Sequence, residues 1–562
     1  MSKKSYAIGV DFGTESGRAL VVDVATGEEL ASAVHAYANG VIDERLPADA
    51  GGAMLEPDWA LQDPNDYLEV FKRAVPEAIK AGGIPAGDVI GMGVDFTACT
   101  MLPTLQDGTP LCFVPRYRHQ PHAWVKLWKH HAAQPEADRV NEVARSMGEA
   151  WLDRYGGRIS SEWFFPKALQ ILNEAPQIYR AADRLIEACD WVVWQLTGTE
   201  TRNSCTAGYK AMWQKESGYP RREYLAALHP GFADVVATKM NCAISPLGAR
   251  AGGLSAQAAG WMGLPPGTAV AVANVDAHVT VPSAQATDAG AMVMIMGTSI
   301  CHMVIGDQLR VVPGMCGVVE DGITPGTFGY EAGQSAVGDI FAWFVEQNVP
   351  AAVEREAQAV GLSVHALLEQ RAAQLRPGES GLIALDWHNG NRSTLVDVEL
   401  GGLMLGATLL TKPHEQYRAL IEATAFGTRE IIETLEAHGV PVHRLVAAGG
   451  LPERNKLLMQ IFADVTQRQI GIVRATQAGA HGAAMHGAVA AGAYKNILLA
   501  ASAMGGLKDE QFTPNARHKA AYDVLYAQYK TLYDYFGRGG NNVMKQLKQM
   551  KRNVRIDYDH EK

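Results

Sequence analysis

The chain has 562 residues, of which 47% are hydrophobic and 20% are charged, and its formal net charge is −10. This composition predicts a soluble protein with a large core, and its acidic balance argues against nucleic-acid binding and against docking on a membrane. No stretch of the sequence reaches the 18 or so consecutive apolar residues that a membrane-spanning helix requires.

The first predicted element is a β-hairpin near the N-terminus. An apolar strand from Tyr6 to Val10 runs into a Gly/Thr/Ser turn, and a second apolar run extends from Arg18 to Val24. Gly13 lets the backbone approach a ligand closely, Thr14 offers a hydroxyl group, and Asp11 is placed to face a metal-bound phosphate. An ordinary hairpin with a polar turn would leave the same pattern, and the motif is neither a P-loop nor a Rossmann fingerprint.

A strongly apolar strand farther along the chain ends at Asp276, and His278 follows two residues later. Phosphoryl transfer to an alcohol requires a carboxylate that orients the hydroxyl and accepts its proton, so Asp276 is the candidate general base. An aspartate at this position would also serve to cap the helix that follows. For His278 we expect a structural role.

The strand-turn-strand pattern recurs near residue 290. An apolar strand there leads into the turn at Gly297 and Thr298, and an apolar run from Ile300 to Ile305 follows. Two such units predict a duplicated α/β fold, although two glycine turns could also coincide by chance. We place the domain boundary in residues 281–288, which gives domains 1–282 and 283–562, the second ending in a helical tail. We expect a nucleotide in the cleft between them.

A third motif runs from Leu445 to Asn455, where an apolar strand breaks at Gly449 and Gly450. Paired glycines leave room for a flat base or a ribose against the backbone. The spacing of apolar residues then predicts a helix from Asn455 to Val465 and a strand from Ile470 to Val473.

These motifs resemble the FGGY family of carbohydrate kinases, in the actin and hexokinase superfamily, over nearly the whole chain. One family signature is similar to residues 163–174, although Gln170 stands where the family usually has Trp. The other is similar to residues 449–466, with Leu-Pro-Glu-Arg-Asn in place of the usual Ser-rich stretch. The resemblance implies an α/β fold of two actin-like (ribonuclease H-like) domains with a nucleotide and sugar cleft between them.

Within the family, residues 127–131, 156–163 and 208–210 are most similar to members that phosphorylate L-ribulose. The resemblance implies ATP-dependent phosphorylation of L-ribulose to L-ribulose 5-phosphate, a step of L-arabinose catabolism. A kinase for another pentulose, such as xylulose or D-ribulose, would share the nucleotide motifs. An actin-like ATPase or chaperone would keep the phosphate turns but lack a sugar pocket.

The resemblance also implies the residues of the site. The sugar-binding set is Asp95, Ala98, Lys210, Asp276 and Glu331. The ATP-binding set is Gly13, Thr14, Arg18, Gly297, Thr298, Gly338, Gly450 and Asn455. Magnesium is expected near Asp11 and Asp276, held largely by nucleotide oxygens and water.

Residues of about 115–165 are expected to form an inserted lobe at the mouth of the sugar site. We expect His130 and His131 to be solvated parts of this lobe, because adjacent helical residues do not share a face and so make a poor metal site. The expected partners are the sugar, ATP and a second copy of the chain in a dimer. Seven cysteines without a Cys-x-x-Cys pair, and an N-terminus without room for a signal peptide, predict a cytoplasmic location.

Overall fold

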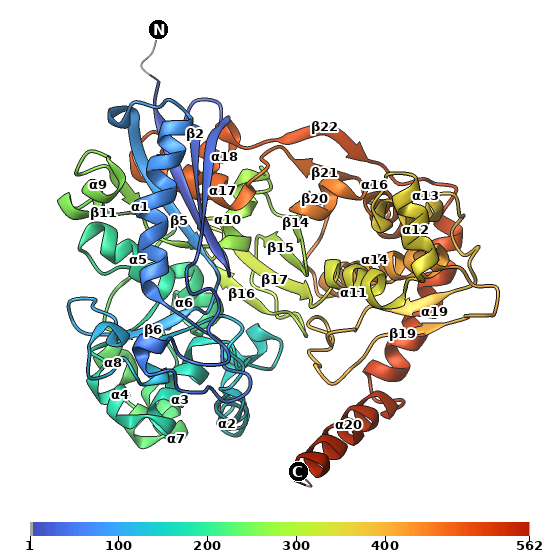
Figure 1. The fold of residues 1–562 in the computed structure, drawn as a ribbon, viewed down its shortest axis with the longest axis horizontal. Coiled ribbons are helices and arrows are strands. Elements are labelled where there is room, and N and C mark those ends of the chain that lie inside the picture. The colour runs from blue at the N-terminus through green and yellow to red at the C-terminus, as the bar shows by residue number, and fades with distance from the viewer. Residues whose placement is uncertain (1–3, 561–562) are drawn as a thin grey trace.

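The structure, a computed structural model, describes residues 4–560. Figure 1 shows two α/β halves side by side, and helix α20 (Val543–His560) projects from the second half at the C-terminal end. Each half is built around a seven-stranded sheet. The fold class predicted from the sequence is thereby confirmed.

The first sheet has the strand order β11-β12-β5-β1-β2-β3, and β13 pairs with β5 off this path. Strands β1 and β2 form the predicted N-terminal hairpin, with β1 parallel to β5 on its other side. The strands are β1 (Tyr6–Phe12), β2 (Ser16–Asp23), β3 (Glu29–Ala36), β5 (Val89–Phe96), β11 (Arg250–Gly253), β12 (Ala269–Ala271) and β13 (Asn274–Val275).

The second sheet repeats this arrangement as β17-β15-β14-β20-β21-β22, with β16 added beyond β17. Pairing directions repeat as well, because β14 is antiparallel to β15 and parallel to β20, as β1 is to β2 and β5. The duplication predicted from two glycine turns is thus present in the topology. The strands are β14 (Ala291–Met296), β15 (Ile300–Gly306), β16 (Gly317–Glu320), β17 (Phe328–Gln334), β20 (Arg444–Ala448), β21 (Ile470–Val473) and β22 (Leu507–Phe512).

Each half contributes one helix that packs against the sheet of the other half. Helix α10 (Asp276–Ser283) follows the last strands of the first sheet but contacts β14 and β15 of the second. Helix α17 (Ala478–Ala490) follows β21 of the second sheet but packs on β1 and β5 of the first. Both helices lie between the sheets in Figure 1. The division at residue 282 stays a prediction, and α17 shows that chain order and packing differ for at least one helix.

A separate lobe lies below the first sheet in Figure 1. Its apolar core draws on residues 42–61, 99–185 and 211–240, a wider range than residues 115–165. Its small sheet has the order β4-β7-β6-β8, with β4 (Leu61–Gln62), β6 (Met101–Thr104), β7 (Val125–Lys126) and β8 (Arg184–Glu187). Its helices include α2 (Gln134–Ser146), α3 (Phe164–Glu174), α4 (Pro176–Ala181), α7 (Arg222–Leu228) and α8 (Val235–Lys239).

The prediction of a solvated His130 is wrong. His130 is fully buried, its Nδ1 accepts the N–H of Ala60 at 3.2 Å, and its Nε2 lies 2.9 Å from Oε1 of Gln170. Gln170 also accepts a hydrogen bond from the buried Lys126 at 3.0 Å. The residue that departs from the family signature therefore belongs to a polar network inside the lobe, whereas His131 is half exposed at its side chain.

The remaining helices cover the sheets. Near the first sheet lie α1 (Pro64–Ala81), α5 (Ala188–Thr197), α6 (Ser204–Lys210), α9 (Ala256–Met262) and α18 (Ile497–Met504). The second half adds α11 (Gly338–Asn348), α12 (Ala351–Ala359), α13 (Val364–Ala372), α14 (Pro413–Ala437), α15 (Gly450–Arg454), α16 (Lys456–Thr466) and α19 (Lys519–Gly537). Short strand pairs are β9 (Arg202–Asn203) with β10 (Ile244–Ser245), and β18 (Ile383–Leu385) with β19 (Leu403–Leu405).

Within residues 4–560, none of the helices has the length and apolarity to cross a bilayer.

Candidate active site at the junction of the two sheets

The first glycine turn is held in place by neighbouring side chains. The N–H of Gly13 donates to the carbonyl of Ser16 at 2.9 Å, and the hydroxyl of Tyr37 donates to the carbonyl of Gly13 at 3.0 Å. The indole N–H of Trp128, from the lobe, donates to Oγ1 of Thr14 at 3.1 Å. The lobe thus touches the turn that is expected to bind phosphate.

The second turn occupies the equivalent position after β14. The N–H of Gly297 donates to the carbonyl of Ser299 at 2.9 Å, and both Gly297 and Thr298 are exposed. The N–H of Gly338, the first residue of α11, donates to the carbonyl of Gly297 at 3.1 Å. A Cβ atom at Gly338 would lie 2.6 Å from that carbonyl oxygen, so only glycine permits this approach. Three predicted ATP-binding residues therefore meet at one edge of the second sheet.

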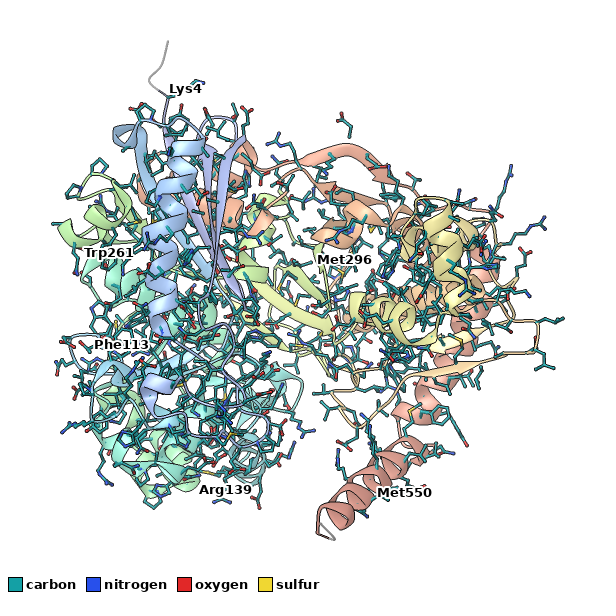
Figure 2. All side chains as sticks on the ribbon, viewed as in Figure 1. Lys4, Phe113, Arg139, Trp261, Met296 and Met550 are labelled. Atoms are coloured by element: carbon teal, nitrogen blue, oxygen red, sulfur yellow. The ribbon has the colours of Figure 1, made fainter. Side chains whose placement is uncertain are left out.

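The paired glycines lie beside this turn, because β20 is the parallel neighbour of β14. Gly449 has φ of 98°, and a Cβ atom there would lie 2.5 Å from the carbonyl oxygen of Met296, which Figure 2 labels. Gly450 begins α15 and is half buried. Asn455 is placed differently, since it is buried and its Oδ1 accepts the N–H of Leu458 at 2.8 Å. The structure thus gives Asn455 the role of N-cap of α16.

Two carboxylates lie side by side at the ends of β1 and β5, where Asp11 and Asp95 are direct register partners. Arg18 is the partner of Asp11 on β2, with its Nε 3.5 Å from Oδ2. Asp95 is fully buried, and neither of its carboxylate oxygens has a hydrogen-bond partner among the described residues. Burial and the charge of Asp11 raise the pKa of Asp95 well above its usual range. Two adjacent carboxylates, one of them without a hydrogen-bond partner, are chemically suited to a cation.

Asp276 is the first residue of α10, and its Oδ1 accepts the N–H of Ala277 at 2.6 Å. Burial raises the pKa of Asp276 to about 7, with the charges of Asp11 and Glu331 acting in the same direction. The N–H of Ala277 and the charge of Lys210 oppose this rise. A carboxylate with a near-neutral pKa is well matched to general-base catalysis at neutral pH.

A buried ion pair joins the two halves next to Asp276. Lys210, the last residue of α6, lies 2.9 Å from Oε2 of Glu331 on β17, and both side chains are almost fully buried. Arg392 lies 2.5 Å from Oε1 of the same carboxylate. Burial alone would raise the pKa of Glu331, but Lys210 and Arg392 lower it to about 2, so the carboxylate is ionised. His278 is 3.5 Å from Oε2, and burial lowers its pKa to about 4, which leaves it neutral.

The structure brings most of the predicted sugar-binding set together. Lys210, Asp276 and Glu331 interact electrostatically, and the half-buried Ala98 follows β5 where the lobe core meets the core between the sheets. Asp95 reaches this group through its charge interaction with Asp276, and it also packs beside Asp11, beneath the first turn of α17.

The sequence analysis missed Arg392, which lies between β18 and β19 in a stretch without a recognised motif. One signal was available, because a glycine inside a strand often marks the close approach of another group. Gly333 is such a residue, two positions after Glu331, and a Cβ atom there would lie 3.0 Å from Cδ of Arg392.

Comparisons with known proteins show which family the chain belongs to. The model of the C-terminal domain of the FGGY family of carbohydrate kinases matches residues 292–491. The chain is 58% identical over 556 residues to a ribulokinase of Geobacillus thermodenitrificans, with 98% of both chains covered. It is 55% identical over 549 residues to a ribulokinase of Mycolicibacterium smegmatis, with 98% of this chain and 97% of that protein covered.

Solved structures with the same fold include a xylulose kinase from Rhodospirillum rubrum, with a TM-score of 0.75, 22% identity, and coverage of 94% of this chain and 98% of that chain. A gluconate kinase from Lactobacillus acidophilus has a TM-score of 0.78, 17% identity, and coverage of 95% and 99%. At these identities the likeness concerns the fold alone. The near full-length identity to ribulokinases, together with the family model, shows that the chain belongs to the FGGY family of carbohydrate kinases and is a sugar phosphotransferase.

Proposed function

We propose that this protein transfers the γ-phosphoryl group of ATP to the terminal hydroxyl of L-ribulose and forms L-ribulose 5-phosphate. One observation carries the proposal: Asp276, with a pKa of about 7, lies beside the Lys210–Glu331 ion pair in a chain 58% identical to a ribulokinase. The relatives supply the identity of the sugar, and the geometry supplies a base and polar groups for its hydroxyls. A place in L-arabinose catabolism and in the cytoplasm follows from this proposal.

In this mechanism Asp276 accepts the proton of the sugar's terminal hydroxyl as the phosphoryl group arrives. Lys210 and Glu331 hydrogen-bond other hydroxyls of the sugar, because a charged donor and a charged acceptor side by side can bind a hydroxyl in either direction. The loop at Ala98 would close one side of the pocket. A site built in this way discriminates against sugars that lack a matching hydroxyl.

The two glycine turns bind the phosphates from the two halves, with Thr14 and Thr298 as hydroxyl donors and Arg18 close to the negative charge. Gly338 and Gly450 leave room for the ribose and the base. Magnesium would be held near Asp11 and Asp276, with the unsatisfied Asp95 beside Asp11, and would spread the charge of the phosphates. Closure of the two halves over the substrates would align them and exclude water, which would otherwise hydrolyse ATP.

The first experiment measures ADP release with Mg-ATP and a panel of L-ribulose, D-ribulose, xylulose, glycerol and no sugar. We expect the highest kcat/KM with L-ribulose and little release without sugar. Preference for xylulose or D-ribulose would keep the fold and the base but overturn the assigned substrate. Sugar-independent ADP release would overturn the kinase mechanism.

Replacing Asp276 by Asn tests the base. We expect kcat to fall by roughly 10²- to 10⁴-fold, since this is the usual contribution of a general base. For the wild type, kcat/KM should fall about tenfold for each pH unit below pH 7, because protonation removes the acceptor from a group whose pKa is about 7. Stopped assays from pH 5.5 to 9 measure both effects. Asp288→Asn, at a side chain that is 87% exposed, is the matched control. Retention of kcat and of the acidic limb in Asp276→Asn would rule out Asp276 as the base.

A further inference from the structure

Glu331 is buried between two cations that come from different parts of the chain. Its Oε1 accepts from Arg392 at 2.5 Å and from Lys210 at 3.1 Å, and its Oε2 accepts from Lys210 at 2.9 Å. Lys210 belongs to the first half, whereas Arg392 comes from a loop of the second half. Arg392 thus holds the carboxylate from the second half, at the oxygen that it shares with Lys210.

The sheet is shaped to receive the Arg392 side chain. It crosses β17 at Gly333, where a Cβ atom would lie 3.0 Å from both Cδ and Nη1. Its Nε lies 3.2 Å from Sγ of Cys316, and its Nη1 lies 3.7 Å from Sγ of Cys301. Thiols are weak acceptors. Glu331 is therefore the one strong acceptor that Arg392 contacts in the described part of the chain.

The backbone around Arg392 is also fixed. Oγ of Ser393 accepts the N–H of Gly333 at 3.2 Å, which ties the loop to β17. Oγ1 of Thr394 lies 2.8 Å from the hydroxyl of Tyr533 on α19. The guanidinium therefore extends from a loop that is fixed on both sides, and 34% of the Arg392 side chain is exposed.

We infer that Arg392 is a positioning residue for the sugar, which acts by holding Oε1 of Glu331 so that Oε2 and Lys210 remain arranged for the sugar's hydroxyls. The inference rests on the proposed function. Without Arg392, Lys210 would be the one cation left on Glu331 among the described residues, and the carboxylate would lose the second contact that fixes its orientation. The nucleotide turns lie on other elements, so binding of ATP should not depend on Arg392.

The test compares the kinetics of Arg392→Ala, Arg392→Gln and Arg392→Lys with those of the wild type. We expect Arg392→Ala and Arg392→Gln to raise the KM for L-ribulose roughly 10- to 100-fold, as for a lost hydrogen bond to a charged group, with the KM for ATP changed less than about twofold. Arg392→Lys should recover part of the loss. Arg517→Ala, at an exposed arginine of the same half, is the matched control.

A double-mutant cycle separates positioning from a general loss of structure. If Arg392 acts through Glu331, adding Arg392→Gln to Glu331→Gln should raise the sugar KM further by less than about twofold. Thermal melting identifies variants that do not fold, and Arg392→Gln decides the test if Arg392→Ala is one of them. An unchanged sugar KM in Arg392→Gln, or additive effects in the cycle, would overturn the inference. Absence of L-ribulose turnover in the wild type would instead overturn the proposed function.

Discussion

Asp276 is a carboxylate whose ionised form the folded protein disfavours. It is removed from water at the start of α10, and Asp11 and Glu331 add negative charge nearby, so its pKa rises to about 7. An unfolded chain would return the group to an ordinary value near 3.8. The ionised form of Asp276, which can accept a proton, is therefore the form that makes the folded protein less stable.

Because the buried ionised carboxylate destabilises the fold, we expect Asp276→Asn to stabilise the ligand-free protein at alkaline pH. The folded pKa is raised, so the wild type is fully stable with respect to this group below pH 3.8 and loses stability as the pH rises to about 7. Asn carries no such dependence. We expect Asp276→Asn to melt several degrees above the wild type at pH 8, at roughly 2–4 °C per kcal/mol for domains of this size, and the difference to shrink towards pH 4.

Differential scanning fluorimetry from pH 4 to 8 measures this difference, with Asp288→Asn as the exposed control. A lower melting temperature for Asp276→Asn at pH 8 would show that ionised Asp276 is stabilised by contacts stronger than those described above.

Residues of the site differ in how far the sequence reveals them. Asp11, Asp276 and Gly13 stand at the ends of apolar strands, so a local pattern identifies them. Gly333 signals that some group approaches β17 closely, but not which one. Arg392 is identified only in the folded chain, because its contacts to Cys301, Cys316 and Glu331 join distant segments. Asn455 is the opposite case. Its motif predicted a contact with the nucleotide, and in the structure its side chain caps α16.

At the level of elements, the close packing of α17 on the first sheet explains a run of small residues. A Cβ atom at Gly9 of β1 would lie 1.7 Å from the carbonyl oxygen of Ala480, and one at Gly93 of β5 would lie 1.9 Å from that of Ala483. The helix backbone therefore packs directly on the strands that carry Asp11 and Asp95 near their ends. Packing here sets the position of the acidic pair.

Gly9→Ala should therefore destabilise the protein severely. The new methyl group would meet the backbone of α17 rather than a flexible side chain, so we expect a loss above the usual range of about 1–3 kcal/mol for overpacking. Urea denaturation measures the loss. Gly260→Ala in α9 is the matched control, because nothing lies within 4 Å of its Cβ position and alanine favours helix. Equal midpoints for the two variants would contradict the packing argument.

Elements with strong local patterns were predictable, and assemblies of distant segments were not. The two hairpins, helix α16 and strand β21 follow from runs of apolar residues, and the stripe of tyrosines on α19 is buried as its helical spacing suggests. The lobe could not be outlined in this way, because three separated segments share one core. The exchange of α10 and α17 likewise depends on tertiary packing.

For the whole molecule, helix α20 leaves one apolar face without a partner in the described part of the chain. Lys545 lies 2.5 Å from Asp397, and Lys548 donates to the carbonyls of Val398 and Leu400 at 2.7 and 2.8 Å, so the basic face rests on the body. Exposed apolar residues follow the 4-3-4 spacing of a coiled-coil seam on the other face: Val543, Leu547, Met550 and Val554. Figure 2 labels Met550 on this projecting helix.

The seam predicts that the expected homodimer forms by pairing of α20 with its copy. The four apolar residues carry no charge and can pair with their own copies, whereas Lys545, Lys548 and Arg552 are engaged by the body, so the face suits a second copy better than an anionic membrane. Sedimentation velocity at micromolar concentration should give twice the monomer mass for the wild type and the monomer mass for Leu547→Glu/Met550→Glu, with turnover of each site retained. Val524→Glu on α19, at a side chain that is also exposed, should remain dimeric. Because only four apolar residues of each α20 form the seam, the interface is small and the dimer should dissociate on dilution. A monomeric wild type that pellets with anionic vesicles would assign this face to a membrane, and a dimer that survives both glutamates would place the interface elsewhere.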